Sequence, residues 1–130
     1  EKTILPKVDV IYFDSENLDE HIEKLYEKEL NKLDSTIPWS VKNQARMHTL
    51  NKVEPYISSI DGMSKFPETA TAIGITFDDK GELHLCAPHG VRDLLAMKIS
   101  PTSYFEGWQI YFDRVKQKNW SVTWPLVKVE

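Results

Sequence analysis

The stretch Val8-Asp9-Val10-Ile11-Tyr12-Phe13-Asp14 decides the fold that we predict for this chain. Its nearly continuous run of β-branched and aromatic residues is typical of a strand covered on both faces. Asp9 is the one charge inside the run, and burying a lone carboxylate costs several kcal/mol unless a metal ion or a cation compensates it. Asp9 is therefore the sharpest candidate for a functional residue. The alternative is an Asp9 that lies at an exposed edge or pairs with Lys7 or Lys42.

The residues after this stretch predict a helix and then a second strand. Asp14-Ser15-Glu16-Asn17 interrupts the run with capping side chains, and apolar residues then recur at helical spacing from Leu18 to about Asp34. Trp39-Ser40-Val41-Lys42-Asn43 alternates apolar and polar residues, like a strand with one face on the core. The order strand, helix, strand favours a right-handed crossover that places the two strands parallel or nearly adjacent in one sheet.

The remainder of the chain predicts shorter elements around one hairpin. Residues 44–66 are expected to be irregular or to form short helical pieces. A Thr-rich and Ile-rich strand over 69–77 turns at Asp78-Asp79-Lys80-Gly81 and returns over 82–86, which predicts a β-hairpin. The other predicted elements are a turn or short helix over 91–95, an edge strand over 97–100, a helix over 103–118, and an aromatic tail at Trp120, Trp124 and Pro125 that folds back on the body.

Composition and charge limit the class of protein. With 130 residues and 41% hydrophobic content, the chain is expected to form a single domain over residues 1–130. The net charge of -4 argues against a protein that coats nucleic acid or an anionic membrane through bulk charge. Cys86 is the only cysteine, which excludes an internal disulfide and a multi-cysteine zinc site and predicts a reducing, cytoplasmic location. No apolar run reaches the roughly 18 residues needed to span a bilayer, so we expect no membrane partner.

A local basic segment follows the second predicted strand. Lys42, Arg46 and His48 occur there with no acid between them, although the chain is acidic elsewhere. Together with Asn43 and Gln44, these residues could supply hydrogen-bond donors to a triphosphate or to a nucleic-acid backbone. The alternative is an ordinary solvated face.

The roles of two further acids, Glu68 and Asp93, are ambiguous. Glu68 precedes a predicted strand, where its side chain can reach a cleft at the end of the sheet, but capping or a surface salt bridge explains it as well. Asp93 is better explained as a helix cap than as a catalytic residue.

The four histidines lack metal-ligand spacing, and the chain has no nucleophile elbow, phosphate loop or dinucleotide fingerprint.

Several segments resemble a bacterial nucleotidyltransferase-like family of largely undefined function. They are residues 8–14, 39–48, 67–72, 87–94 and 114–120 with Trp124-Pro125, so the resemblance covers essentially the whole chain. The part from Asp61 to Leu94 also resembles the head domain of CCA-adding and poly(A) polymerases. There Thr69 and Ala72 match a threonine and an alanine of a motif in those enzymes, but its arginines and aspartate do not match at Lys65, Phe66 and Pro67.

The resemblance implies a fold and a mechanism. The fold is α/β (α+β), a mixed sheet flanked by helices as in polymerase β-like nucleotidyltransferases, here without the N-terminal helix and glycine turn. The chain opens on Glu1, so residues 1–130 are expected to be the C-terminal two-thirds of a longer protein. In this fold two carboxylates on one strand, spaced Asp-x-Asp, hold Mg²⁺ and position an NTP. Asp9 matches the second carboxylate, as catalytic residue and metal ligand, and Lys7 stands at the position of the first.

Three hypotheses follow. The first is an enzyme that transfers a nucleotidyl group from an NTP to a hydroxyl acceptor, RNA or a small molecule, in an Mg²⁺-dependent reaction. Its nucleotide-binding residues would be Lys42, Asn43, Arg46, His48, Glu68 and Thr69. The second, motivated by Lys7, is a catalytically inactive module that binds nucleotide or RNA. The third is an interaction domain that uses the tryptophans of the C-terminal region, Trp108, Trp120 and Trp124.

Overall fold

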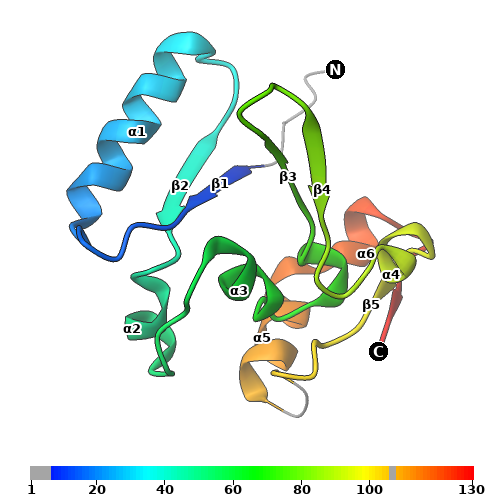
Figure 1. Cartoon of the computed structure of the whole chain (residues 1–130). Helices are drawn as coiled ribbons and strands as arrows, with labels where there is room; N and C mark the ends of the chain where they lie inside the picture. The colour runs from blue at the N-terminus through cyan, green and yellow to red at the C-terminus, as the bar shows by residue number, and fades with distance from the viewer. Residues whose placement is uncertain (1–6, 106–107) are drawn as a thin grey trace. The chain divides into compact units, whose positions relative to one another are not determined.

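The computed structural model describes residues 7–105 and 108–130, which belong to two compact units, Glu1–Gly62 and Met63–Glu130. The expected segment upstream of Glu1, and residues 106–107 of the predicted last helix, lie outside the described residues. Helices and strands mix in both units (Figure 1), which confirms the mixed α/β class. The described strands pair in twos, in three two-stranded sheets rather than in the single mixed sheet that we expected. None of the described helices is long and apolar enough to cross a membrane.

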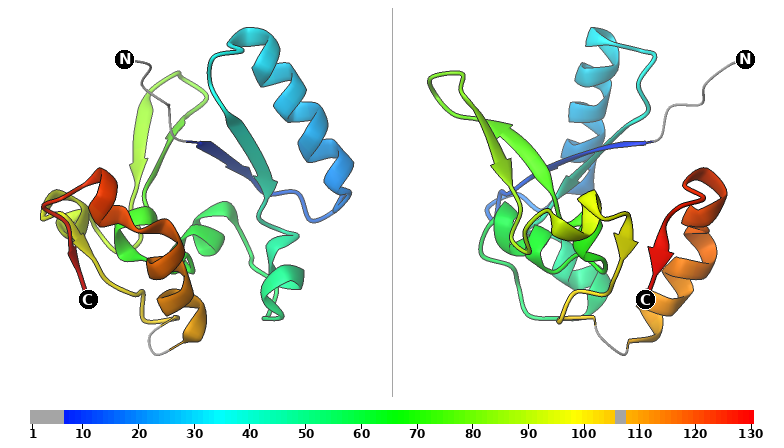
Figure 2. Two further views of the ribbon diagram at one scale, coloured as in Figure 1. Left: turned by 180° about the vertical axis from the view of Figure 1, so that it is seen from behind. Right: turned by 90° about the vertical axis from the view of Figure 1, so that its right-hand side faces the viewer.

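The first unit is built on a parallel pair of strands. β1 (Val8–Tyr12) and β2 (Trp39–Asn43) are in register with Val8 opposite Trp39 and Tyr12 opposite Asn43. α1 (Glu20–Leu33) connects them and runs alongside the pair in each view (Figures 1 and 2). The predicted strand, helix, strand order is therefore confirmed. The cap of α1 is Asp19, whose carboxylate accepts the backbone N–H of His21 at 2.9 Å.

Two glutamates of α1 cover the open edge of β2. The side chain of Glu27 accepts the N–H of Val41, and that of Glu23 accepts the N–H of Asn43, each at 3.0 Å. Unpaired edge groups invite pairing with another chain, and these carboxylates satisfy them instead. The ring of Tyr12 also packs edge-on against Tyr26 of α1, with ring centroids 5.3 Å apart. α1 thus covers both an edge and a face of the strand pair.

Short helices follow β2, as predicted for residues 44–66. They are α2 (Met47–Asn51) and α3 (Ser59–Ser64), and α3 lies at the boundary between the two units. Gly62 in α3 allows a close approach: a Cβ atom there would lie 2.6 Å from the side-chain oxygen of Gln44 and 3.1 Å from the ring of Tyr56. A larger residue at this position would push the helix away from the segment after β2.

The second unit begins with a correction to the predicted strand over 69–77. Thr69–Thr71 forms a 3₁₀ helix (η1), and only Gly74–Phe77 is a strand (β3). The hydroxyl of Thr71 donates to the carbonyl of Glu68, a local bond that competes with extended backbone. β3 pairs antiparallel with β4 (Leu83–Cys86), so the hairpin itself is confirmed. In Figure 2 it projects from the helices of its unit.

The C-terminal region folds back on its own unit, as predicted. Its elements are α4 (Arg92–Leu95), β5 (Lys98–Ile99), α5 (Gln109–Lys118), α6 (Trp120–Thr123) and β6 (Lys128–Val129). β6 pairs parallel with β5. The last long helix begins at Gln109 rather than near Ser103, because Phe105 and Trp108 close consecutive turns before it and their rings pack at 5.1 Å. Tyr111 of α5 is 1% exposed and anchors this region.

Candidate functional site

Asp9 lies on the face of the β1–β2 pair opposite α1. Side chains alternate along a strand, and Tyr12, which contacts α1, points the other way from Asp9. Lys7 Nζ is 3.6 Å from Asp9 Oδ1, and the two side chains are 60% and 63% exposed. The cost of burying Asp9 therefore does not arise, and of the two interpretations of this residue the exposed, lysine-paired one is observed. Such an exposed pair contributes only about 0–1 kcal/mol, so Lys7 can be displaced.

Lys42 shares this face with Asp9. It lies opposite Ile11 in the register, and Asp9 lies opposite Ser40, so the two charged residues are two positions apart along neighbouring strands. The half-buried side chain of Lys42 extends from the same surface as Asp9. The face thus presents the carboxylate of Asp9 together with the ammonium groups of Lys7 and Lys42.

Asn43 is a structural centre at the carboxyl ends of the two strands. Its Oδ1 accepts the N–H groups of Asp14 and Ala45 at 3.0 and 3.1 Å. Its Nδ2 donates to the carbonyls of Asp14 and Asn17 at 2.9 and 3.1 Å. All four hydrogen-bonding positions of the amide are occupied. Asn43 therefore joins the loop after β1 to the turn after β2.

Arg46 is held by a buried carboxylate. Its Nε donates to Glu23 Oε2 at 2.8 Å and its Nη2 to Glu23 Oε1 at 3.0 Å. Glu23 is fully buried and the Arg46 side chain is 13% exposed. The hydrogen bonds that Arg46 donates to the Glu23 carboxylate raise the pKa of the Arg46 guanidinium, which stays charged. The predicted role of Arg46 at a nucleotide remains a prediction, and its observed role is to fix the segment after β2 onto α1.

Two polar atoms near this end of the strands have no hydrogen-bond partner among the described residues. They are the hydroxyl of Tyr12 and Nδ1 of His48, and both are enclosed by protein. Burial and then the Glu23 carboxylate raise the pKa of Tyr12, so this hydroxyl stays protonated. Ligands of parallel α/β sheets bind outside the carboxyl ends of the strands. His48 lies in the helix that follows the carboxyl end of β2, and its predicted role at a nucleotide remains a prediction.

The second unit contains a similar buried ion pair. Glu68 is fully buried, and its two oxygens accept bonds from Arg114 Nε at 3.1 Å each, while Arg114 Nη2 lies 2.7 Å from Oε1. Glu68 occupies the N-cap position of η1, but its side chain makes no capping hydrogen bond, and its pair with Arg114 is not a surface salt bridge because the carboxylate is fully buried. Thr69 donates its hydroxyl to Asp93 Oδ2 at 2.5 Å. Asp93 therefore ties α4 to η1, and the helix cap predicted for it is wrong because Val91 occupies that position.

One group of side chains outside these sites has the composition of a metal site. Ligand atoms of Asp78, Glu82 and His84 lie within 4.8 Å of one another at the turn of the hairpin. Asp78 Oδ1 accepts the N–H groups of Lys80 and Glu82, and Oδ2 lies 2.8 Å from His84 Nε2. The contact with His84 lowers the pKa of Asp78. Asp78 and His84 therefore have a structural explanation, because the hydrogen bonds of Asp78 stabilise the turn of the hairpin.

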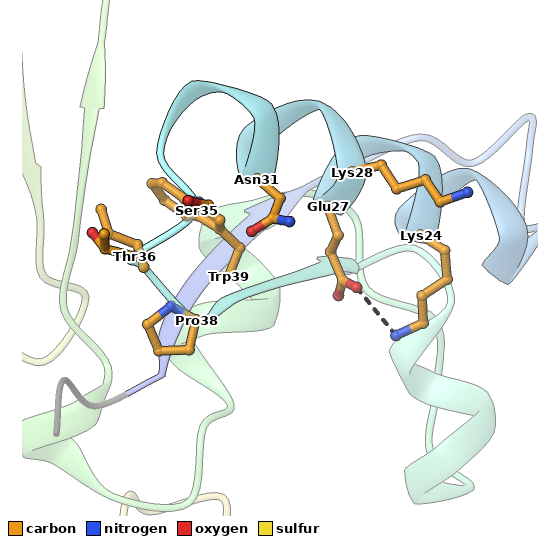
Figure 3. A pocket seen from close by; sticks show the side chains of 9 residues that line it. Lys24, Glu27, Lys28, Asn31, Ser35, Thr36, Pro38 and Trp39 are labelled. Atoms are coloured by element: carbon orange, nitrogen blue, oxygen red, sulfur yellow. Dashed lines mark hydrogen bonds and ion pairs between the residues drawn. The ribbon is translucent and has the colours of Figure 1, made fainter.

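A groove lies on the α1 side of the first unit (Figure 3). It has a volume of 720 Å³ and runs between α1 and the segment that enters β2. Lys24, Lys28 and Asn31 line it from one stripe of α1, and Lys24 pairs with Glu27 at 3.3 Å. Trp39 closes the other side. Because Trp39 points away from the face that carries Asp9, this groove is separate from the candidate site.

Sequence reasoning missed the partners of the buried charges. Glu23 sits in a helix that is rich in exposed acids and bases, and it is 23 residues from Arg46, so no local pattern marks the pair. Arg114 lies in the last long helix, far in the sequence from the acid that it binds. Its bond to Glu68 spans 46 residues. The one available signal was an i, i+4 pair of glutamates, Glu23 and Glu27, facing the same strand.

Comparisons with known proteins agree on one family. A family model described as nucleotidyltransferase matches residues 1–129. A solved NMR structure, described as revealing a CCA-adding enzyme head domain, is similar to this chain with 32% sequence identity and a TM-score of 0.84. The similarity covers 96% of this chain and 68% of that one. A search of curated proteins gives no match.

Proposed function

The chain belongs to this nucleotidyltransferase family, and on that premise we propose that it transfers a nucleotidyl group from an NTP to a hydroxyl acceptor with the help of Mg²⁺. The acceptor is RNA or a small molecule with a hydroxyl group, and the reaction takes place in the cytoplasm. The observation that carries the proposal is the exposed carboxylate of Asp9, with Lys42 on the same strand face.

The residues on this face fit Mg²⁺ through one protein ligand. Nucleotide sites commonly hold Mg²⁺ by one or two carboxylates together with phosphate oxygens of the substrate. Asp9 supplies one carboxylate, and its exposure leaves room for the phosphates. A bound ion would neutralise phosphate charge and favour ionisation of the acceptor hydroxyl. Lys42 would meet a phosphate oxygen as a point charge.

The other predicted residues enter the proposal in supporting positions. Asn43 and Arg46 hold the loops that flank the carboxyl ends of the strands, and His48 shapes the nucleotide site beside them. Glu68 and Thr69 belong to the second unit, where Arg114 and Asp93 hold them, and their contact with the nucleotide remains a prediction. Measuring NTP affinity in Thr69→Val and Glu68→Gln tests this part separately.

A second candidate function rests on the ion pair between Lys7 and Asp9. An ammonium 3.6 Å from the carboxylate satisfies it without a metal, and it stands where a second carboxylate would sit on the same strand face. With Lys7 and Lys42 both available to phosphates, the chain would bind nucleotide or RNA without turnover. This module would need no Mg²⁺.

Titration calorimetry with each of the four NTPs, in Mg²⁺ and in chelator, separates the two functions. The variants are Asp9→Asn, Lys7→Ala and Lys7→Asp. Lys32→Ala is the matched control, because it also removes an exposed lysine from an ion pair, 3.1 Å from Glu29. Pyrophosphate release with an RNA oligonucleotide or a polyol as acceptor measures turnover.

The enzyme predicts NTP binding that requires Mg²⁺, is lost in Asp9→Asn and is strengthened in Lys7→Asp. The inactive module predicts binding that persists in chelator and weakens in Lys7→Ala and in Lys7→Asp. Under either hypothesis the control variant, Lys32→Ala, should bind NTP as the unmodified chain does. Absence of heat with every NTP in both conditions would refute both functions.

A further inference from the structure

The turn of the β3–β4 hairpin brings together three potential metal ligands that the proposed function does not use. A carboxylate oxygen of Asp78, one of Glu82 and a ring nitrogen of His84 lie within 4.8 Å of one another. All three residues belong to the second unit, so their arrangement is set within that unit. The group contains an imidazole as well as two carboxylates, and it therefore offers a nitrogen ligand that a purely acidic surface lacks.

The register of the hairpin explains why these three side chains meet. The N–H of Asp78 donates to the carbonyl of Glu82 at 2.9 Å, so these two residues extend the β3–β4 ladder by one pair. His84 lies two positions after Glu82, and side chains alternate along a strand. Because directly opposed residues share a face, all three ligands stand on one face of the hairpin. The large apolar side chains occupy the other face, and they are Ile75, Phe77, Leu83 and Leu85.

The turn already holds part of the group in place. Asp78 Oδ1 accepts the N–H groups of Lys80 and Glu82 at 2.8 and 2.9 Å. Oδ2 lies 2.8 Å from His84 Nε2. Hydrogen bonds to a carboxylate of this kind orient it for metal binding. No hydrogen bond or ion pair within the described part of the chain engages the Glu82 carboxylate, which can turn toward the same point.

The distances and the ligand types favour an ion of the zinc type. Zinc binds nitrogen and oxygen ligands at about 2.0–2.2 Å in tetrahedral geometry, so its ligand atoms lie about 3.3–3.6 Å from one another. The side chains of Glu82 and His84 are exposed, and movements of about 1 Å bring the three ligand atoms to this spacing. An imidazole ligand suits zinc and similar transition ions, whereas Mg²⁺ and Ca²⁺ prefer oxygen ligands.

We propose that the hairpin turn binds one divalent ion of the zinc type through Asp78 Oδ2, the Glu82 carboxylate and His84 Nε2, with water in the fourth position. Two carboxylates and a neutral imidazole balance the charge of such an ion. The ion replaces the contact between His84 and Asp78 and joins the two ends of the turn. This site lies outside the proposed function and requires neither Asp9 nor Mg²⁺.

Titration calorimetry of the full chain with zinc chloride at pH 7 tests the proposal. The variants His84→Gln and Glu82→Gln each remove one ligand and leave the hydrogen bonds that Asp78 accepts from the turn in place. The matched control is His21→Gln, which also removes an exposed histidine, but one outside the group. As a second measurement, NMR of the unmodified chain follows the ring signals of His84 and does not depend on how the variants fold.

The unmodified chain should bind Zn²⁺ saturably, and Zn²⁺ should shift the ring signals of His84. His84→Gln and Glu82→Gln should each weaken this binding at least about tenfold, and an excess of Mg²⁺ or Ca²⁺ should not displace the zinc. His21→Gln should leave the affinity unchanged, and so should Asp9→Asn, which separates this result from a failure of the proposed enzyme. Unshifted His84 signals, unchanged zinc affinity in His84→Gln, or displacement of the zinc by Ca²⁺ would each overturn the proposal.

Discussion

Replacing Arg46 with alanine should destabilise the first unit strongly, with or without a nucleotide. The substitution removes two hydrogen bonds, at 2.8 and 3.0 Å, from the fully buried carboxylate of Glu23. That carboxylate would keep one partner, the N–H of Asn43. A charge left inside the protein without its counter-ion is the main source of the loss.

The expected size of the effect follows from burial. Removing one member of a buried ion pair costs about 3–5 kcal/mol of unfolding free energy, whereas an exposed pair contributes about 0.2–1 kcal/mol. Lys32→Ala, which breaks the exposed pair with Glu29, gives the lower reference. Arg46→Lys keeps the charge but loses the two-point contact with the carboxylate. Its loss of unfolding free energy should therefore lie between the losses in Lys32→Ala and in Arg46→Ala. Replacing both Glu23 and Arg46 with methionine should cost less than the sum of the single changes, because no buried charge remains.

Urea unfolding at pH 7, followed by circular dichroism and evaluated by linear extrapolation, measures these differences. If Arg46→Ala lies within about 1 kcal/mol of Lys32→Ala, the Glu23 carboxylate does not depend on Arg46 and the reasoning is wrong. Nucleotide affinity, measured below the unfolding transition, then shows whether Arg46 has the additional role predicted from the sequence.

Three other predictions concern stability and titration. Arg114→Ala leaves the buried Glu68 without its guanidinium and should lower the unfolding free energy by about 3–5 kcal/mol in thermal unfolding, with partial recovery in Arg114→Lys. The N–H of Val41 lowers the pKa of Glu27 below its usual 4.5, so the stability from this group is present above pH 4.5 and is lost as the pH falls through the folded-state pKa. Acid unfolding curves of Glu27→Gln should therefore lose this part of their pH dependence. Burial raises the pKa of Tyr111, so ultraviolet titration should detect its ionisation above pH 10, and Tyr111→Phe should reduce the amplitude of this late step, to which Tyr12 also contributes.

Local patterns predicted the elements that depend on local chemistry. The alternation of Trp39-Ser40-Val41-Lys42-Asn43 and the helical spacing after Leu18 were sufficient for the parallel pair and its crossover helix. The turn at Asp78-Asp79-Lys80-Gly81 was sufficient for the hairpin, since Gly81 has a φ of 77° and Asp78 accepts two N–H groups of the turn.

Contacts between distant segments, or between neighbouring rings, explain why the predicted strand over 69–77 and the predicted start of the last helix were wrong. Thr69 was placed in a strand because of its β propensity, but its hydroxyl bonds to Asp93 and its N–H to Ser100, which hold it in η1. The last helix was extended to Ser103 because the aromatic spacing continues there. In the structure those rings pack on one another in turns instead. Neither set of partners is visible within a short window of sequence.

Asp9 was selected from the sequence as a buried acid, but in the structure it is exposed, and the carboxylates of Glu23 and Glu68 are the buried ones. A buried acid does require a cation, and the two acids that are fully buried among the described residues, Glu23 and Glu68, each have a guanidinium within 2.8 Å. Those pairs stabilise the two units and have little freedom to exchange partners. Asp9 is exposed and pairs with the exposed ammonium of Lys7, so exchanging that partner for Mg²⁺ or gaining a phosphate neighbour costs little. Exposure, rather than burial, is therefore the property that keeps Asp9 the best candidate for chemistry in this chain.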